Sequence, residues 1–163
     1  MLAACLLLPF GAQAQTAGQD FMSVKRMSME LARDIAQAAV KACRDKGYQV
    51  TAAVVDRNGD TQVVMRDVYA PEVSLRIAKQ KAYTSVMFSV STKELEASRP
   101  EAGSTLNHVE GLLFARGALP IEMGSGTMVG AVGVSGAPGG DIDEACAQKG
   151  LDAVAERLQF GGM

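Results

Sequence analysis

The sequence has no tryptophan and few other aromatic residues, since Phe and Tyr together make up 5% of its 163 residues. A core must therefore be filled by Ala, Val, Leu and Met, and the apolar content of 48% is enough to build one. An excess of positive charge is also missing, because the net charge is -2, and nucleic-acid binding usually requires a basic face. No apolar run reaches the roughly 18–20 residues of a membrane-spanning helix. We expect one globular domain that neither binds nucleic acid nor spans a membrane.

Several common catalytic and metal-binding patterns are absent as well. There is no C-x-x-C or H-x-x-x-H spacing, and His108 is the single histidine of the chain. Ser135 does not lie in the G-x-S-x-G turn of serine hydrolases. It also occupies the place of the second glycine in what would otherwise approach a G-x-G-x-x-G dinucleotide-binding fingerprint. The sequence therefore names no catalytic residue and leaves open whether the protein is an enzyme.

The N-terminus differs in composition from the rest of the chain. A short apolar run, Leu2–Phe10, precedes the small residues of Ala12-Gln13-Ala14, which is typical of a secretory signal peptide, although no Lys or Arg precedes the run. We expect residues 1–14 to be cleaved, residues 15–27 to form a polar arm and residues 28–163 to form the domain. The mature protein is then expected to be periplasmic or extracellular.

The three cysteines fall in two settings. Cys5 lies in a segment resembling a lipoprotein cleavage site, but it precedes most of the apolar run, so we disfavour that interpretation. Cys43 and Cys146 fall on the buried faces of the first and last predicted helices. The simpler interpretation is that both are small, unpaired core residues. The alternative is one disulfide between these helices, which an oxidising compartment would allow.

Periodicity, caps and turns predict the order α-β-β-α-α-β-β-α. Ser28 and Ser91 are placed to cap the first and third helices, and Asn58-Gly59 is a strong β-hairpin signal. The predicted helices cover residues 28–45, 72–88, 91–99 and 141–158, and the predicted strands cover residues 48–56, 61–67, 119–123 and 127–135. A glycine-containing connection, residues 101–116, carries His108.

The last two predicted strands form the hairpin around which the fold is expected to be organised. The second of them has small or β-branched residues on both faces, so it should lie in the middle of the sheet. Strict alternation puts Val129 and Gly133 on one face and Met128 and Val132 on the other. Glycine within a strand suggests that another element packs closely against its backbone. The predicted fold class is α+β, with a central antiparallel sheet of about four to five strands flanked by helices.

Four stretches of the sequence carry a family resemblance. They are the helix from Glu30, AVVDRNGD at residues 53–60, IAKQKAYTSVMF at residues 77–88, and ALPIEMGSGTMVGAVGVSGAPGGDIDEACAQKGLDA at residues 118–153. In this order they resemble the GlcG/HbpS family of haem-binding proteins, which are also associated with haem degradation. The same domain occurs at the C-terminus of some corrinoid adenosyltransferases. The chain departs from the family at Ala118, in a loop that often carries two glycines.

The resemblance implies properties that go beyond the fold. Family members bind haem, are often secreted or periplasmic, and assemble into homo-oligomers that can be octameric. Some influence redox signalling, which would involve a partner protein that the sequence does not identify. The resemblance thus predicts a periplasmic or secreted haem-binding protein.

Haem iron needs a His, Met, Tyr or Cys ligand, and the haem propionates favour Arg or Lys. His108 and Tyr83 are the candidate iron ligands. Arg76, Lys79 and Tyr83 form one stripe on the second predicted helix. Lys81, which belongs to the KAYT motif shared with the family, points elsewhere. The alternative is that this stripe is simply the solvated face of the helix.

Ser135 and Gly136 precede a glycine-rich turn and a helix start, where free backbone N–H groups could hold a carboxylate or phosphate. This arrangement supports a second hypothesis, that the protein is an enzyme or accessory protein binding a small anionic organic ligand beside the hairpin. A third hypothesis is a ligand-free subunit that builds an oligomer or docks on a partner. The sequence does not rank these two.

Overall fold

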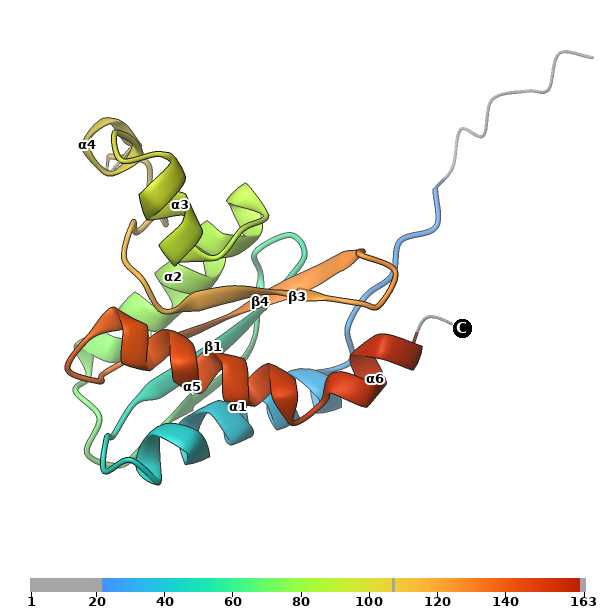
Figure 1. The fold of residues 1–163 in the computed structure, drawn as a ribbon, viewed down its shortest axis with the longest axis horizontal. Coiled ribbons are helices and arrows are strands. Elements are labelled where there is room, and N and C mark those ends of the chain that lie inside the picture. Colours follow the sequence, from blue (N-terminus) through green and yellow to red (C-terminus); the bar gives the residue numbers. More distant parts are fainter. Residues whose placement is uncertain (1–21, 107, 162–163) are drawn as a thin grey trace, which may run out of the picture.

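The computed structural model describes residues 22–106 and 108–161. Within them, four strands form one antiparallel sheet in the order β2-β1-β4-β3, with helices on both faces (Figure 1). The strands are β1 Thr51–Asp56, β2 Thr61–Arg66, β3 Ala118–Glu122 and β4 Met128–Ser135. The helices are α1 Met29–Arg44, α2 Val73–Phe88, α3 Thr92–Ser98, α4 Ala102–Leu106, α5 Gly140–Asp152 and α6 Ala155–Phe160. The predicted signal peptide, residues 1–14, lies outside the described residues.

The predicted class and element order are confirmed, with two refinements. The connection before the last hairpin contains the short helix α4, and the last predicted helix is divided into α5 and α6. Between α5 and α6 the chain turns at Val154, whose side chain is buried in the core. The first strand begins at Thr51, three residues later than predicted. No helix among the described residues is both long enough and apolar enough to span a membrane.

Local signals in the sequence act as expected at the helix starts and in the first hairpin. The Ser28 hydroxyl accepts a hydrogen bond from Leu31 N at 3.2 Å, and the Ser91 hydroxyl accepts one from Glu94 N at 3.0 Å. Gly59 supplies the positive φ of +91° in the β1–β2 turn. Because short-range chemistry dictates these features, they could be predicted without knowledge of the tertiary structure.

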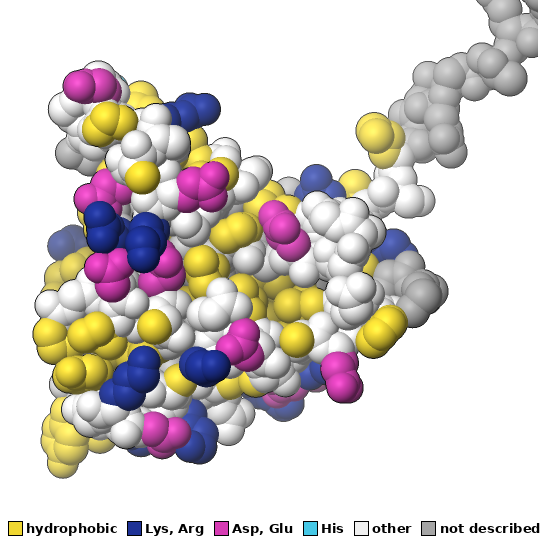
Figure 2. All heavy atoms as spheres, viewed as in Figure 1, with side chains coloured by type: hydrophobic (Ala, Val, Ile, Leu, Met, Phe, Trp, Pro, Cys, Tyr) yellow, Lys and Arg dark blue, Asp and Glu magenta, His cyan; other side chains and the backbone are white. Residues whose placement is uncertain are grey.

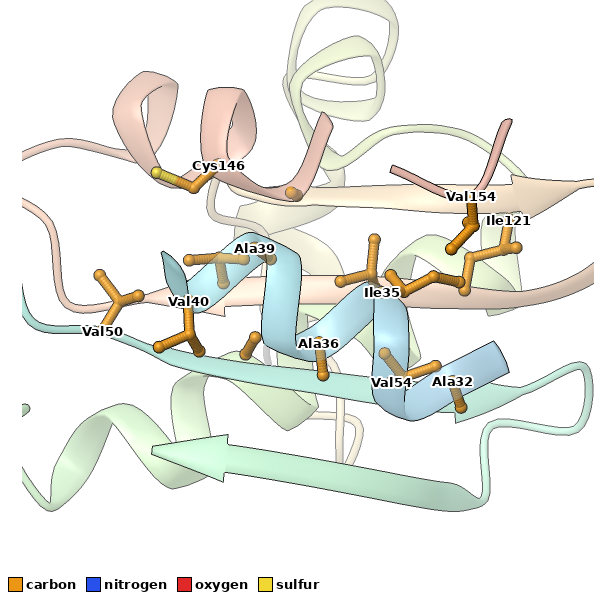
Figure 3. Packing of buried hydrophobic residues seen from close by; sticks show 14 of the residues in the cluster. Ala32, Ile35, Ala36, Ala39, Val40, Val50, Val54, Ile121, Cys146 and Val154 are labelled. Carbon is orange, nitrogen blue, oxygen red and sulfur yellow. The ribbon is translucent and has the colours of Figure 1, made fainter. Parts of the chain in front are cut away.

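The face of the sheet covered by α1 and α5 holds the main apolar core. Figure 3 shows α1 lying against the strands, with α5 beside it. The buried members of this cluster include Ala32, Ile35, Ala36, Ala39, Val40, Val50, Val54, Ile121, Cys146 and Val154. Small residues permit the close approach of the two helices, since a Cβ added to Gly150 of α5 would lie 2.7 Å from the backbone oxygen of Ile35. The expectation that the first and last helices are neighbours is therefore confirmed.

Cys43 of α1 and Cys146 of α5 form a disulfide, with their Cα atoms 5.5 Å apart. The simpler interpretation of two unpaired core cysteines is wrong, and the alternative holds. The sequence pattern placed both residues on buried faces but could not show that the two faces meet at the same turn. The disulfide joins residues 103 positions apart and fixes α5 onto α1.

β4 lies between β1 and β3 and is buried along almost its whole length, as predicted. A bulge nevertheless breaks its alternation, because consecutive residues Ile121 and Glu122 pair with β4 residues that are two positions apart. Val129 is the extra residue. It packs in the α1–α5 core, while Met128 packs against the α2 cluster. The prediction that Val129 shares a face with Gly133 is therefore wrong.

α2 covers the opposite face of the sheet and crosses β4 at close range. A Cβ added to Gly133 would lie 2.7 Å from Ala82 N and even closer to the carbonyl oxygen of Ala78, both in the α2 backbone. Gly133 is thus the contact point that the strand glycine predicted. The apolar cluster on this side is small and consists of Val55, Ala82, Val86 and Ala131, with Met128 packed against it.

Candidate functional site

A cavity of about 570 Å³ opens where β4 ends, between α2, the segment before β3 and the start of α5. Its lining residues include four of the predicted site residues, Arg76, Lys81, Ser135 and Gly136. Most of its remaining wall is apolar and is formed by Pro71, Val73, Ile77, Leu113, Ala115 and Ala137. The structure therefore brings together predicted residues from α2 and from the glycine-rich turn, which are far apart in the sequence.

A buried ion pair forms the polar end of this cavity. Lys81 Nζ lies 2.9 Å from Asp143 Oδ2 and donates a second hydrogen bond to Val134 O at 3.0 Å. The two side chains are only 6% and 5% exposed. A Cβ added to Gly117 would lie 2.8 Å from Lys81 Nζ, so the chain just before β3 covers the pair. An ammonium group has three N–H donors, and the third has no acceptor among the described residues.

Asp143 is a site residue that the sequence reasoning missed. Its other oxygen, Oδ1, accepts a hydrogen bond from Ala137 N at 3.0 Å, which ties the glycine-rich turn to the first turn of α5. Burial raises the pKa of the Asp143 carboxyl, and the charge of Lys81 opposes this effect. Acidic residues at a helix start are usually explained by the helix dipole. The available signal was spacing, because Asp143 falls on the same stripe as the buried Cys146 and Gly150.

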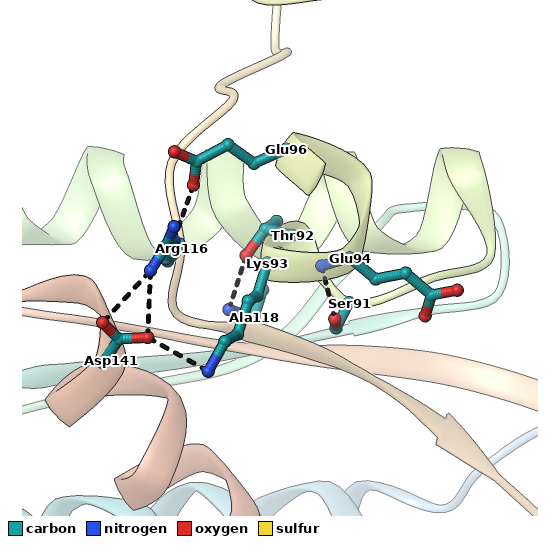
Figure 4. Close-up of polar contacts among 8 residues, drawn as sticks. All are labelled: Ser91, Thr92, Lys93, Glu94, Glu96, Arg116, Ala118 and Asp141. Carbon is teal, nitrogen blue, oxygen red and sulfur yellow. Dashed lines mark hydrogen bonds and ion pairs between the residues drawn. The ribbon is translucent and has the colours of Figure 1, made fainter. Parts of the chain in front are cut away.

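The segment that closes the cavity is anchored at both ends. Leu113 N donates to the Thr84 hydroxyl on α2 at 2.8 Å. Three residues later, Arg116 bonds Glu96 of α3 at 2.7 Å and Asp141 of α5 at 3.2 Å (Figure 4). In Figure 2 charged side chains of both signs gather between α3 and the start of α5, where this network lies. The cavity wall is therefore held in place by α2, α3 and α5 together.

The remaining predicted ligands do not line the cavity. Lys79 is exposed on α2. Tyr83 is half-buried, and its ring packs between two glycine backbones, because a Cβ would meet the ring at 2.6 Å from Gly59 and at 3.2 Å from Gly111. His108 is exposed on the loop that leads to Gly111. The predicted stripe on α2 is thus divided, with Arg76 at the cavity and Lys79 and Tyr83 outside it.

The described residues contain no group of three or more His, Cys, Asp or Glu side chains arranged to hold a metal ion. The charge network around Asp141 consists of ion pairs instead, because the Asp141 carboxylate contacts Lys93 at 3.2 Å as well as Arg116. These cations hold the pKa of Asp141 below its ordinary value. The network is a structural clamp in which each carboxylate already faces a cation.

The comparison with known families identifies the fold. A family model described as "Haem degrading protein HbpS-like" matches residues 27–152. This chain belongs to the HbpS-like family. The match covers all four strands and α1 through α5, including both halves of the Lys81–Asp143 pair. The resemblance drawn from the sequence is therefore confirmed.

Solved structures agree with this assignment. The crystal structure of HbpS is 34% identical, covers 86% of this chain and 99% of its own, and has a TM-score of 0.75. A double mutant of HbpS from Streptomyces reticuli matches with the same identity and TM-score over 90% of this chain. The crystal structure of a PduOC–haem complex is 26% identical over 79% of this chain and 95% of that chain, with a TM-score of 0.71.

A curated relative places the domain within a larger protein. The corrinoid adenosyltransferase PduO of Citrobacter freundii is 29% identical over 114 residues, which are 68% of this chain. The matched part is only 34% of that relative's length. The chain therefore spans about a third of the adenosyltransferase.

Proposed function

We propose that this protein binds haem in the periplasm or outside the cell. The observation that carries the proposal is membership of a family described as haem-degrading and HbpS-like, together with the similarity to a haem complex of the same fold. Haem supplies a redox-active iron centre when it is bound. The residues of this chain would provide the iron ligand and the cations that face the propionates.

One surface of the structure offers the groups that haem requires. The α2 outer face consists of Arg76, Lys79, Tyr83 and Met87, which follow one another at spacings of three and four residues and therefore share a side of the helix. Tyr83 offers a phenol oxygen and Met87, 42% exposed, offers a thioether. Arg76 and Lys79 offer two cations for carboxylates. In donor type and charge, these residues fit haem.

The second candidate ligand lies near the same face. Gly111 packs directly against the Tyr83 ring, and His108 is three residues away along the chain. Three residues span at most about 10 Å, so the His108 backbone lies within about that distance of Gly111. Tyr83 and His108 are therefore the two side chains that we propose as iron ligands, and Arg76 and Lys79 as the propionate partners.

The proposed location is supported by the cysteine chemistry. Structural disulfides persist in oxidising compartments and are rare in the cytosol. The Cys43–Cys146 disulfide between α1 and α5 therefore agrees with the export signal expected in residues 1–14. Assembly into a homo-oligomer, an octamer in the form that the resemblance suggests, is part of the same proposal. Intact-mass and native-mass measurements of the exported protein test both, since retention of Met1 or a monomer would contradict them.

A haemin titration followed at the Soret band tests the haem proposal. Saturable binding with micromolar affinity or better is expected. The double change Arg76→Ala and Lys79→Ala should weaken binding roughly tenfold to a hundredfold if each cation makes a charge-assisted bond, whereas Lys41→Ala with Lys46→Ala, on the α1 side, should not. Tyr83→Phe should remove a phenolate charge-transfer band if Tyr83 is the ligand, and His108→Ala should shift the Soret band if His108 is. The absence of a saturable Soret shift in the parent protein would overturn the proposal.

A further inference from the structure

The Lys81 cavity contains a buried ammonium and a buried hydroxyl, of Lys81 and Ser135, that the proposed haem site does not use, and only Arg76 is common to both sites. Its polar end is a buried ammonium with one unused N–H, and it holds none of the proposed iron ligands. Removing an ammonium from water costs several kcal/mol, and its donors must be satisfied to offset that cost. A third acceptor supplied by a ligand in the cavity would complete the set. We propose that this cavity binds a small organic monocarboxylate with an apolar body.

The charge of the cavity specifies one negative charge on the ligand. Lys81 and Asp143 cancel each other, and both Asp143 oxygens are already engaged, by Lys81 Nζ and by Ala137 N. Arg76, at the α2 wall, forms no ion pair with any residue in 22–106 or 108–161. The cavity therefore keeps one net positive charge, on a guanidinium whose planar fork matches a carboxylate.

A buried hydroxyl adds a third polar group. Ser135 ends β4 beside Lys81, is only 6% exposed, and lines the cavity. Its hydroxyl forms no side-chain hydrogen bond within the described part of the chain. The nearby Ser74 hydroxyl differs, because it is held by Thr51 and by the carbonyl of Pro71. Ser135 is thus free to donate to a ligand oxygen, as is Lys81.

The apolar wall of the cavity favours an organic carboxylate over an inorganic anion as the ligand. Val73, Ile77 and Leu113 line the same cavity as the ion pair, and its volume of about 570 Å³ is within the range of small-molecule sites. Phosphate or sulfate would leave this wall in contact with water, whereas an aliphatic or aromatic body would bury it. Because Leu113 and Arg116 are both anchored, the wall is formed before any ligand arrives.

Calorimetric titration with matched probes tests the proposal on the intact mature protein. Isovalerate and benzoate should each bind, and at least tenfold more tightly than isovaleramide and benzamide, which keep the shape and lose the charge. Inorganic phosphate should bind more weakly than either acid. Equal affinity for acid and amide, no binding of either acid, or stronger binding of phosphate would each overturn the proposal.

Variants locate the binding and separate it from haem binding. Arg76→Gln and Ser135→Ala should each weaken benzoate binding about tenfold, while Lys79→Gln, on the same helix but outside the cavity, should leave it unchanged. Lys79→Gln should weaken haemin binding instead, and Ser135→Ala should not. Benzoate binding that is unaffected by Arg76→Gln and Ser135→Ala would overturn the assignment of the site, whatever haemin does. Because Arg76 is exposed and unpaired in the described structure, its variant is expected to fold.

Discussion

The α1–α5 face of the sheet buries a large apolar cluster closed by a disulfide, whereas the α2 face buries a small apolar cluster together with charged and hydroxyl side chains. Lys81, Thr84, Ser85 and Asp143 are all buried on or beside α2. Apolar burial is the main source of stability, while buried polar groups cost stability unless each is satisfied. The α1–α5 face therefore carries the stability of the fold, which allows the α2 face to carry a cavity and candidate ligands.

The largest expected effect is on the α2 face, from breaking its buried ion pair. Lys81→Met leaves the Asp143 carboxylate buried without its cation, and such a change typically costs about 3–5 kcal/mol. Lys81→Met combined with Asp143→Asn removes both charges and should recover most of this loss. Urea unfolding measures both variants. Equal stabilities of the single and double variants would show that the pair is not buried as described.

The α1–α5 face should respond almost as strongly to loss of the disulfide. Replacing Cys43 and Cys146 with Ala opens a loop of about a hundred residues, for which losses of roughly 2–5 kcal/mol are typical. Thermal unfolding measures the change. If the two faces have separate roles, the affinity of this variant for haemin and benzoate at a temperature where it remains folded should match that of the parent. A variant that is stable but binds neither would contradict the separation.

Glycine substitutions compare helix packing on the two faces with the same chemical change. The methyl group added by Gly150→Ala would lie too close to backbone atoms of α1, and the one added by Gly133→Ala too close to backbone atoms of α2. Each substitution should therefore lower the free energy of unfolding by about 1–3 kcal/mol. Gly103→Ala is the control, since its Cβ would lie an ordinary 3.6 Å from Phe114 Cβ. Gly133→Ala should also weaken benzoate binding because it displaces the helix that carries Lys81, whereas Gly150→Ala should not. Denaturant titration measures the stability of each variant, and calorimetry measures its affinity for benzoate.

The effect of acid on folding stability is expected to be the smallest of these effects. Its sign is opposite for the Asp67 carboxyl beside α1 and the Asp143 carboxyl beside α2. The hydrogen bond from Arg44 of α1 lowers the pKa of the Asp67 carboxyl. Stability from this group is therefore present above the unfolded pKa, near pH 4, and is lost as the pH falls through the lower folded value. Because Arg44 is half exposed, the contribution should be about 1 kcal/mol or less. Stability curves from pH 5 to pH 2 should be flatter for Asp67→Asn than for the parent protein. An Asp67→Asn variant that loses stability in acid as steeply as the parent would contradict the assigned role of the Arg44 pair.

Asp143 is expected to act in the reverse direction. Burial raises its pKa in the folded state, so its contribution is fully present below the unfolded value and decreases as the pH rises through the folded one.

The sequence was informative where local patterns determine structure. Ser28, Ser91 and Asn58-Gly59 set helix starts and a turn by contacts within a few residues, and the two-faced apolar character of β4 placed it inside the sheet. The bulge at Val129 could not be foreseen, because it depends on how β3 and β4 are registered.

The site was harder to predict than the fold for the same reason. Lys81 and Asp143 are 62 residues apart, and no local sequence motif predicts that the two residues pair. Arg76, Lys81, Ser135 and Gly136 were identified individually, and only the crossing of α2 over β4 brings them to one cavity. Arg76, Lys79 and Tyr83 share one side of α2 as predicted, but only Arg76 lines that cavity.

The claim that function lies on the α2 face is tested most directly by the paramagnetic effect of haemin on amide NMR signals. Ferric haemin at saturation should broaden the signals of residues 79–87 on α2 and 108–113 on the following loop, while signals of α1 and α5 keep their intensity. Zinc protoporphyrin, which is diamagnetic, is the control for broadening caused by exchange alone. Broadening confined to α1 and α5, or none at saturating haemin, would contradict the account.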